Sequence, residues 1–245
     1  MPVGLQHEHL PNGIEILRLD RPAQRNALNL GLIGALVDAL GHLGADPDLR
    51  AIVLSTTSTD AFCAGADVNE PLTAGQGVAR MDAFAALYAA IEAVPAPTIA
   101  VCLGHCVGAG AELAVGCDLR VIADNVASPG LEPASACRWA RPGSLPWSAL
   151  SRAKELIFTG RSIDQAEAVA LGLAARTATV TDAETVALAL AEELGRQSSP
   201  GLRELKRMFA DFEAAPARVA RENAILTRWQ RRGPGLPAGP PADDA

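Results

Sequence analysis

The chain has little of several residue types, and each shortage narrows what it can be. Aromatic side chains make up 4% of the 245 residues and include a single tyrosine. No apolar run approaches the roughly 18 residues that a membrane-spanning helix needs. The first residues also lack the basic stretch followed by an apolar one that is typical of a secretory leader. We therefore expect a cytoplasmic protein with no membrane partner.

Basic residues are scarce as well. The chain carries 21 Lys and Arg against 28 Asp and Glu, which gives a formal net charge of −7. Nucleic acids and anionic membranes need a basic surface that displaces counterions or meets lipid head groups. The sequence thus predicts no nucleic-acid partner, and a polyanionic ligand would have to be held by local Arg or Lys.

Metal-ligand spacing is absent from the sequence. The five cysteines form no Cys-x-x-Cys pair and no zinc-type spacing with the four histidines. We expect them to be small, reduced core residues and predict no metal site. The cysteines are Cys63, Cys102, Cys106, Cys117 and Cys137.

What the chain does have is apolar residues, which make up 49% of it and suit a compact α/β fold. Apolar strand-like segments alternate with helical patterns in the first part, and only helical patterns follow from about residue 151. The predicted strands are 14–19, 51–56, 98–103 and 118–123, and the late helices are 151–158, 164–171, 183–197 and 200–213. We predict an α/β core over 1–195, a helical region over 196–230 and a disordered Pro/Gly tail over 231–245.

Two loops of small residues follow predicted buried strands. A-F-C-A-G-A-D-V occupies 61–68, and G-H-C-V-G-A-G-A-E-L-A occupies 104–114 and opens a helix. Helix N-termini present unpaired N–H groups and the positive end of a dipole, which suits a developing negative charge. The two loops could supply two N–H donors to one oxygen, as an oxyanion hole does. Glu112 would lie in the first helical turn, either as a reacting carboxylate or as one that merely favours the dipole.

A dinucleotide site is a competing interpretation of the second loop. Gly104, Gly108 and Gly110 have the spacing found in short-chain dehydrogenases. Those enzymes also need a Tyr-x-x-x-Lys pair, and here Tyr88 is followed four residues later by Glu92. The dinucleotide interpretation therefore lacks its chemistry.

Four segments, in order, resemble the signatures of the crotonase (enoyl-CoA hydratase/isomerase) family. They are R-P-A-Q-R-N-A-L at 21–28, A-F-C-A-G-A-D-V at 61–68, G-H-C-V-G-A-G-A-E-L-A-V-G-C-D at 104–118 and G-R-S-I-D-Q-A-E-A-V-A-L-G-L at 160–173. The resemblance implies a spiral of ββα units with a helical C-terminal trimerisation region, assembled as a homotrimer or hexamer. It also implies an acyl-CoA substrate, whose coenzyme A is part of the substrate, so that no separate cofactor is expected.

The resemblance assigns roles to individual residues. It places the oxyanion-hole donors at the N–H groups of Ala64 and Ala109, and the two catalytic carboxylates at Glu112 and Glu132. Coenzyme A would be bound by Arg25, Gly65, Ala66, Asp67 and Gly108.

Glu132 lies in the stretch 128–150, which departs from the family pattern and has the order Leu131-Glu132-Pro133. Three hypotheses follow. Two working glutamates predict an enoyl-CoA hydratase, and Glu112 alone predicts an isomerase or another enolate chemistry of the family. A blocked site would leave a non-catalytic acyl-CoA-binding protein.

Overall fold

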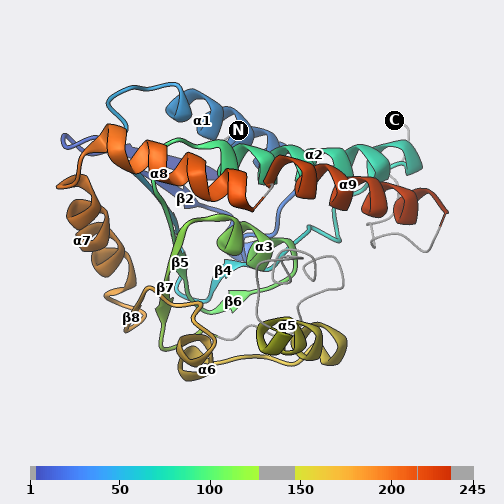
Figure 1. The fold of residues 1–245 in the computed structure, drawn as a ribbon. Helices are drawn as coiled ribbons and strands as arrows, with labels where there is room; N and C mark the ends of the chain where they lie inside the picture. The colour runs from blue at the N-terminus through green and yellow to red at the C-terminus, as the bar shows by residue number, and fades with distance from the viewer. Residues whose placement is uncertain (1–3, 127–146, 214, 233–245) are drawn as a thin grey trace.

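The computed structural model describes residues 4–126, 147–213 and 215–232 (Figure 1). A six-stranded sheet with the order β1-β2-β3-β5-β7-β8 forms its centre. β1 runs antiparallel to β2, and the other neighbouring strands are parallel. The strands are β1 (Leu5–His9), β2 (Ile14–Leu19), β3 (Ala51–Thr56), β5 (Thr98–Cys102), β7 (Leu119–Ala123) and β8 (Arg176–Ala178). β2, β3, β5 and β7 confirm the four predicted strands.

Two short strands form a second, smaller sheet. β4 (Ala61–Cys63) pairs in parallel with β6 (His105–Cys106). Each follows a strand of the large sheet and precedes a helix, so the chain repeats as β3-β4-α2 and β5-β6-α3. The helices are α2 (Ala74–Ala93) and α3 (Ala109–Gly116). This is the repeated ββα unit that the resemblance implied.

Side-chain caps mark the start of the first two helices. The side chain of Asn29 accepts a hydrogen bond from the N–H of Leu32 and caps α1 (Leu30–Gly44). Thr73 and Gln76 form a reciprocal capping box at the start of α2. These caps satisfy N–H groups that have no partner within the helix.

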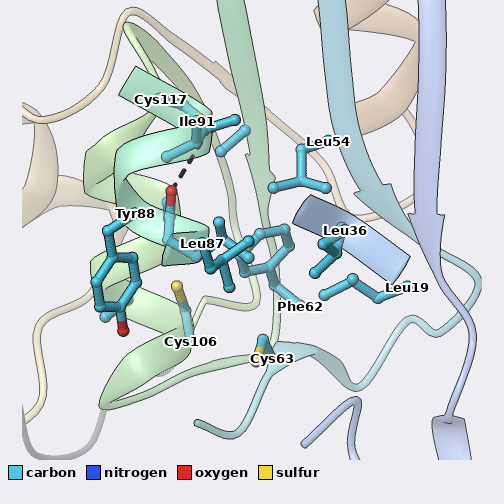
Figure 2. Close-up of a cluster of buried hydrophobic side chains, with 14 of the residues drawn as sticks. Leu19, Leu36, Leu54, Phe62, Cys63, Leu87, Tyr88, Ile91, Cys106 and Cys117 are labelled. Atoms are coloured by element: carbon cyan, nitrogen blue, oxygen red, sulfur yellow. Dashed lines mark hydrogen bonds between the residues drawn. The ribbon is translucent and has the colours of Figure 1, made fainter. Parts of the chain in front are cut away.

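One face of the large sheet is covered by α1, α2 and α3. Leu19 and Leu54 point from the sheet toward Leu36 of α1 and toward Leu87 and Ile91 of α2 (Figure 2). All five side chains are buried. Because α3 packs in the same cluster, this core supports the helix whose first turn carries Glu112.

The opposite face of the sheet packs against α7 (Ala183–Gly195). Ile14, Ile16 and Val53 form a second buried cluster there with Ala187. The alternation of β2 side chains between the two clusters is the period-two pattern of a strand buried on both faces.

Helices follow from residue 147, close to the predicted start at about 151, but the prediction of helices alone was wrong, because β8 adds a strand at the edge of the sheet. They are α5 (Trp147–Thr159), α6 (Gln165–Ala170), α7, α8 (Ser199–Phe212) and α9 (Ala215–Arg232). α9 lies alongside α2 (Figure 1), and Arg218 forms an ion pair with Glu92 at 2.7 Å. The predicted disordered tail overlaps the end of α9 at 231–232, and the rest of it lies outside the described residues. No helix within the described ranges is long and apolar enough to cross a membrane.

Candidate active site

A cavity of about 650 Å³ opens between the N-terminus of α3, the segment that follows β4 and one face of α2. The turn around η1 (Pro22–Gln24) forms another wall, and Leu226 of α9 contributes to the lining. Met81, Phe84 and Tyr88 line it from α2 at helical spacing. The cavity therefore brings together three segments that are far apart in the sequence: 23–27, 64–69 and 107–112.

The N-terminus of α3 depends on two glycines. Gly108 has φ of 50°, in the region that side chains rarely adopt. Gly110 packs so closely on β4 that an added Cβ would lie 2.6 Å from the Cβ of Cys63 and 2.7 Å from its Sγ. These glycines let α3 begin directly against β4, with its first N–H groups at the cavity wall.

The N–H of Ala109 is the first of these groups. It donates to no other group among the described residues, whereas the N–H of Gly110 bonds to the carbonyl oxygen of Val107 at 2.9 Å. Ala109 also lines the cavity. Its N–H is therefore available to a ligand, and it lies at the positive end of the α3 dipole.

Hydrogen bonding in the segment after β4 conflicts with the other predicted donor, Ala64. The N–H of Ala64 donates to the carbonyl oxygen of Arg25 at 2.9 Å, so it is not available to a ligand. The predicted assignment of the second oxyanion donor to Ala64 therefore conflicts with the backbone hydrogen bonding.

Ala66, which the resemblance assigned to coenzyme A binding, is the candidate donor in this segment. On either side of it, the carbonyl of Gly65 accepts from Leu28 N–H at 2.7 Å and the N–H of Asp67 donates to Leu28 O at 3.0 Å. Because neighbouring N–H groups of an extended chain point in opposite directions, the Ala66 N–H points away from Leu28. It has no protein acceptor in the described part of the chain, and Ala66 lines the cavity.

The free N–H of Ala66 lies close to that of Ala109 in the fold. Gly65 has φ of 93°, and an added Cβ there would lie 2.9 Å from Val107 O and 3.4 Å from Ala109 N. The loop thus passes directly over the start of α3. Two backbone N–H groups without protein acceptors, from separate loops, flank the same part of the cavity.

Glu112 lies in the first turn of α3 and lines the same cavity. Its side chain is 4% exposed, and its N–H donates to Gly108 O at 3.0 Å. The buried carboxyl group is thus one helical turn from the free N–H of Ala109. Glu132, the second predicted carboxylate, lies outside the described residues.

Two of the predicted coenzyme A residues differ in their surroundings. Arg25 is exposed at the cavity wall, with a left-handed backbone (φ of 49°) and no ion pair to a described residue. Asp67 is 6% exposed, and its carboxylate accepts from Arg21 at 2.9 Å and from the N–H of Asn69 at 3.1 Å. Arg25 can therefore meet an anionic ligand, whereas the carboxylate of Asp67 is occupied within the protein. Gly65 and Gly108 also line the cavity.

Sequence reasoning missed Asn26, which holds these loops together. Its side chain is fully buried and donates to Thr56 Oγ1 at 2.6 Å and to Ala61 O at 2.9 Å. Its Oδ1 accepts from the N–H of Arg21 at 2.8 Å. The residue stands in the 21–28 motif, and the sequence signal for a structural turn there was its type, because Asn tolerates a left-handed backbone, here with φ of 57°, better than most residues.

Tyr88 was also missed, because its spacing on α2 is that of an ordinary core position. Its ring is buried and stacked on Phe84 with 6.1 Å between the ring centroids. Its hydroxyl donates to the carbonyl oxygen of Ala109 at 3.4 Å. Tyr88 therefore links α2 to the residue that provides one free N–H.

The cysteines near the site are buried, as predicted for the four that the structure describes. Burial raises the pKa of the Cys63 thiol to about 12. A hydrogen bond with the Cys102 thiol, together with burial, raises the pKa of Cys106 well above its usual value. Thiols held neutral in this way are poor nucleophiles. No group of three potential metal ligands occurs among the described residues. Cys137 falls outside them.

Comparison with known proteins shows which family the chain is similar to. A family described as enoyl-CoA hydratase/isomerase matches residues 9–227. A probable mitochondrial enoyl-CoA hydratase 2 of Arabidopsis thaliana is 31% identical over 204 residues, which cover 80% of this chain and 67% of the relative.

Solved structures share the fold. An enoyl-CoA isomerase from M. smegmatis superposes with a TM-score of 0.72 and 26% identity, covering 86% of this chain and 94% of that one. An enoyl-CoA hydratase from Bacillus anthracis gives a TM-score of 0.77 over 96% of this chain and 99% of its own, and its 24% identity supports the fold alone. The chain belongs to the enoyl-CoA hydratase/isomerase family, the crotonases.

Proposed function

We propose that the chain hydrates a 2-enoyl-CoA thioester, with the thioester oxygen held by the N–H groups of Ala66 and Ala109. The observation that carries the proposal is the pair of backbone N–H groups without protein acceptors at one cavity, beside the buried Glu112. Each such donor typically lowers the barrier by about 2.7–4 kcal/mol, because it stabilises negative charge that develops on the oxygen. Drawing electrons to that oxygen makes the β-carbon electrophilic and the enolate accessible.

Glu112 then acts as a general acid or base. Two carboxylates could hold one water between them, one accepting its proton while the other delivers a proton to the α-carbon, which gives syn addition. Glu132 is the proposed second carboxylate. Arg25 is the proposed contact for the anionic part of coenzyme A, because it is an exposed cation at the cavity wall with no ion pair to a described residue.

Isomerisation of the double bond is the second candidate. Within the described part of the cavity wall, Glu112 and Asp67 are the acidic residues, and the carboxylate of Asp67 is bound by Arg21. A single glutamate could move a proton between the α- and γ-carbons. The similarity to the M. smegmatis isomerase also favours this candidate.

Product analysis separates the two reactions. In the first assay the protein is incubated with crotonyl-CoA, and loss of the conjugated enoyl absorbance is followed. In the second a 3-enoyl-CoA is supplied, and appearance of the conjugated enoyl absorbance is measured. Hydration that falls at least about a hundredfold in Glu132→Gln supports two-carboxylate chemistry. Isomerisation unaffected by Glu132→Gln supports the single-glutamate alternative. Tight acyl-CoA binding without either reaction would overturn both and favour a non-catalytic binding protein. Assembly as a homotrimer or hexamer, and a cytoplasmic location, stay predictions.

A further inference from the structure

The loop that carries the free N–H of Ala66 is anchored through the next residue, Asp67. The Asp67 N–H donates to Leu28 O at 3.0 Å, and its carbonyl oxygen accepts from Nη1 of Arg80 at 3.3 Å. Its carboxylate accepts from Nη2 of Arg21 at 2.9 Å. Every polar group of Asp67 is therefore bound within the protein, and both the 21–28 segment and α2 hold this one residue.

The two arginines reach Asp67 from different sides of the cavity. Arg21 precedes η1, its side chain is 18% exposed, and it also donates to the carbonyl oxygen of Ala27. Arg80 belongs to α2 and is fully buried. Burying a guanidinium group costs free energy unless charge and hydrogen-bond partners compensate for it. Two such groups at one loop indicate that the position of this loop is strongly constrained.

We propose that Arg21 and Arg80 form a positioning clamp, which acts through Asp67 to aim the Ala66 N–H at the thioester oxygen. The inference rests on the proposed function of the cavity and adds residues that do not touch the substrate. Asp67 adjoins Ala66, so any shift of Asp67 turns the Ala66 N–H. A misplacement of about 1 Å can cost about a hundredfold in rate even when the substrate still binds. The clamp thus governs polarisation of the carbonyl rather than affinity for coenzyme A.

Arg21→Met tests the clamp, because methionine keeps much of the side-chain volume and removes the ion pair and the hydrogen bonds. Arg18→Met is the matched control. Arg18 forms a similar ion pair with Glu184 at 2.6 Å, with side chains 21% and 31% exposed, but it packs against α7 away from the cavity. Arg21→Lys keeps the charge and tests for partial rescue.

Two measurements distinguish positioning from support of the fold. The first is kcat and KM on crotonyl-CoA, and the second is the red shift of a bound aryl-conjugated enoyl-CoA, which reports how strongly its carbonyl is polarised. We expect Arg21→Met to lose about tenfold to a hundredfold in kcat, with KM within about threefold and a smaller red shift. Arg18→Met should keep kcat and the red shift, even if its melting temperature falls equally.

Equal kcat and equal red shift in Arg21→Met and Arg18→Met would overturn the clamp. If Arg21→Met does not fold, Asp67→Asn and Arg21→Lys give the same comparison with smaller changes. The proposed function fails separately. A folded wild type that shows neither turnover nor a red shift refutes it and the clamp together, whereas normal wild-type behaviour with unperturbed clamp variants refutes the clamp alone.

Discussion

Gly110 sets how closely α3 lies against β4, and Gly110→Ala changes that spacing by a single methyl group. The new Cβ would stand 2.6 Å from the Cβ of Cys63 and 2.7 Å from its Sγ, and it would also meet the Cys63 carbonyl oxygen. The optimal separation of two non-bonded carbon atoms is about 3.5–4.0 Å, so the helix has to move away from β4 by roughly 1 Å. The obstacle includes backbone atoms, which cannot rotate aside.

The expected loss of stability is modest, because two effects oppose each other. Overpacking of this kind costs about 1–3 kcal/mol. Alanine in a helix recovers about 0.5–1 kcal/mol relative to glycine. The net change in the free energy of unfolding is then between about 0 and 2.5 kcal/mol, which thermal or urea unfolding can measure.

The expected loss of activity is larger, because the shift displaces the Ala109 N–H together with Glu112. A displacement of about 1 Å can lower the rate by about a hundredfold. The assay is kcat on crotonyl-CoA, with urea unfolding measured on the same preparations.

Gly34→Ala provides the control within the same chain. Gly34 lies on the exposed side of α1, and no atom lies within 4 Å of an added Cβ. This variant should gain about 0.5–1 kcal/mol of stability and keep its activity. A Gly110→Ala variant with the stability and rate of Gly34→Ala would contradict a tight contact between α3 and β4.

Three further outcomes are expected. Ala66→Pro removes an N–H that has no acceptor among the described residues, so kcat should fall about 10²–10³-fold. Far-UV circular dichroism should stay native. Unchanged turnover would exclude the Ala66 N–H as a donor. Arg25→Glu should raise the dissociation constant of coenzyme A, most strongly at low salt, and a titration showing the same constant at low salt would remove Arg25 from the site. Burial raises the pKa of Cys117 from 9.0 to about 12. The unfolded chain therefore releases this proton first as pH rises above about 9, and the stability of the wild type should fall toward pH 12, by about 1.4 kcal/mol per pH unit for this thiol. Cys117→Ala should show a shallower alkaline loss in urea unfolding, and equal slopes would contradict the assignment.

The parts of the fold that the sequence predicted are those with a strong local pattern. The β3 segment Ala51–Thr56 is buried along its whole length, and its continuous apolar run indicates a strand covered on both faces. β1 (Leu5–His9) is mostly exposed and polar at the edge of the sheet, so it carries no comparable signal. β4 and β6 contain only 3 and 2 residues, too few for a periodicity.

In the site, too, only the features that depend on a local pattern could be predicted. Glu112 and the N–H of Ala109 could be located because they depend on the start of one helix. Whether Ala64 or Ala66 offers the second N–H depends on bonds to Arg25 and Leu28, nearly 40 residues earlier in the chain. No local pattern in 61–68 contains that information. The roles of Arg21 and Asn26 are likewise defined by contacts with distant loops.

The most direct test of the account is the rate of crotonyl-CoA hydration by Glu112→Gln, measured at saturating substrate beside a separate binding titration. Glutamine keeps the size and the hydrogen-bonding reach of the side chain but cannot accept or deliver the proton as a carboxyl group does. General acid–base groups contribute about 10²–10⁴-fold, so the account predicts a loss of at least about a hundredfold with the dissociation constant of the thioester nearly unchanged. Full hydration activity in Glu112→Gln would contradict it.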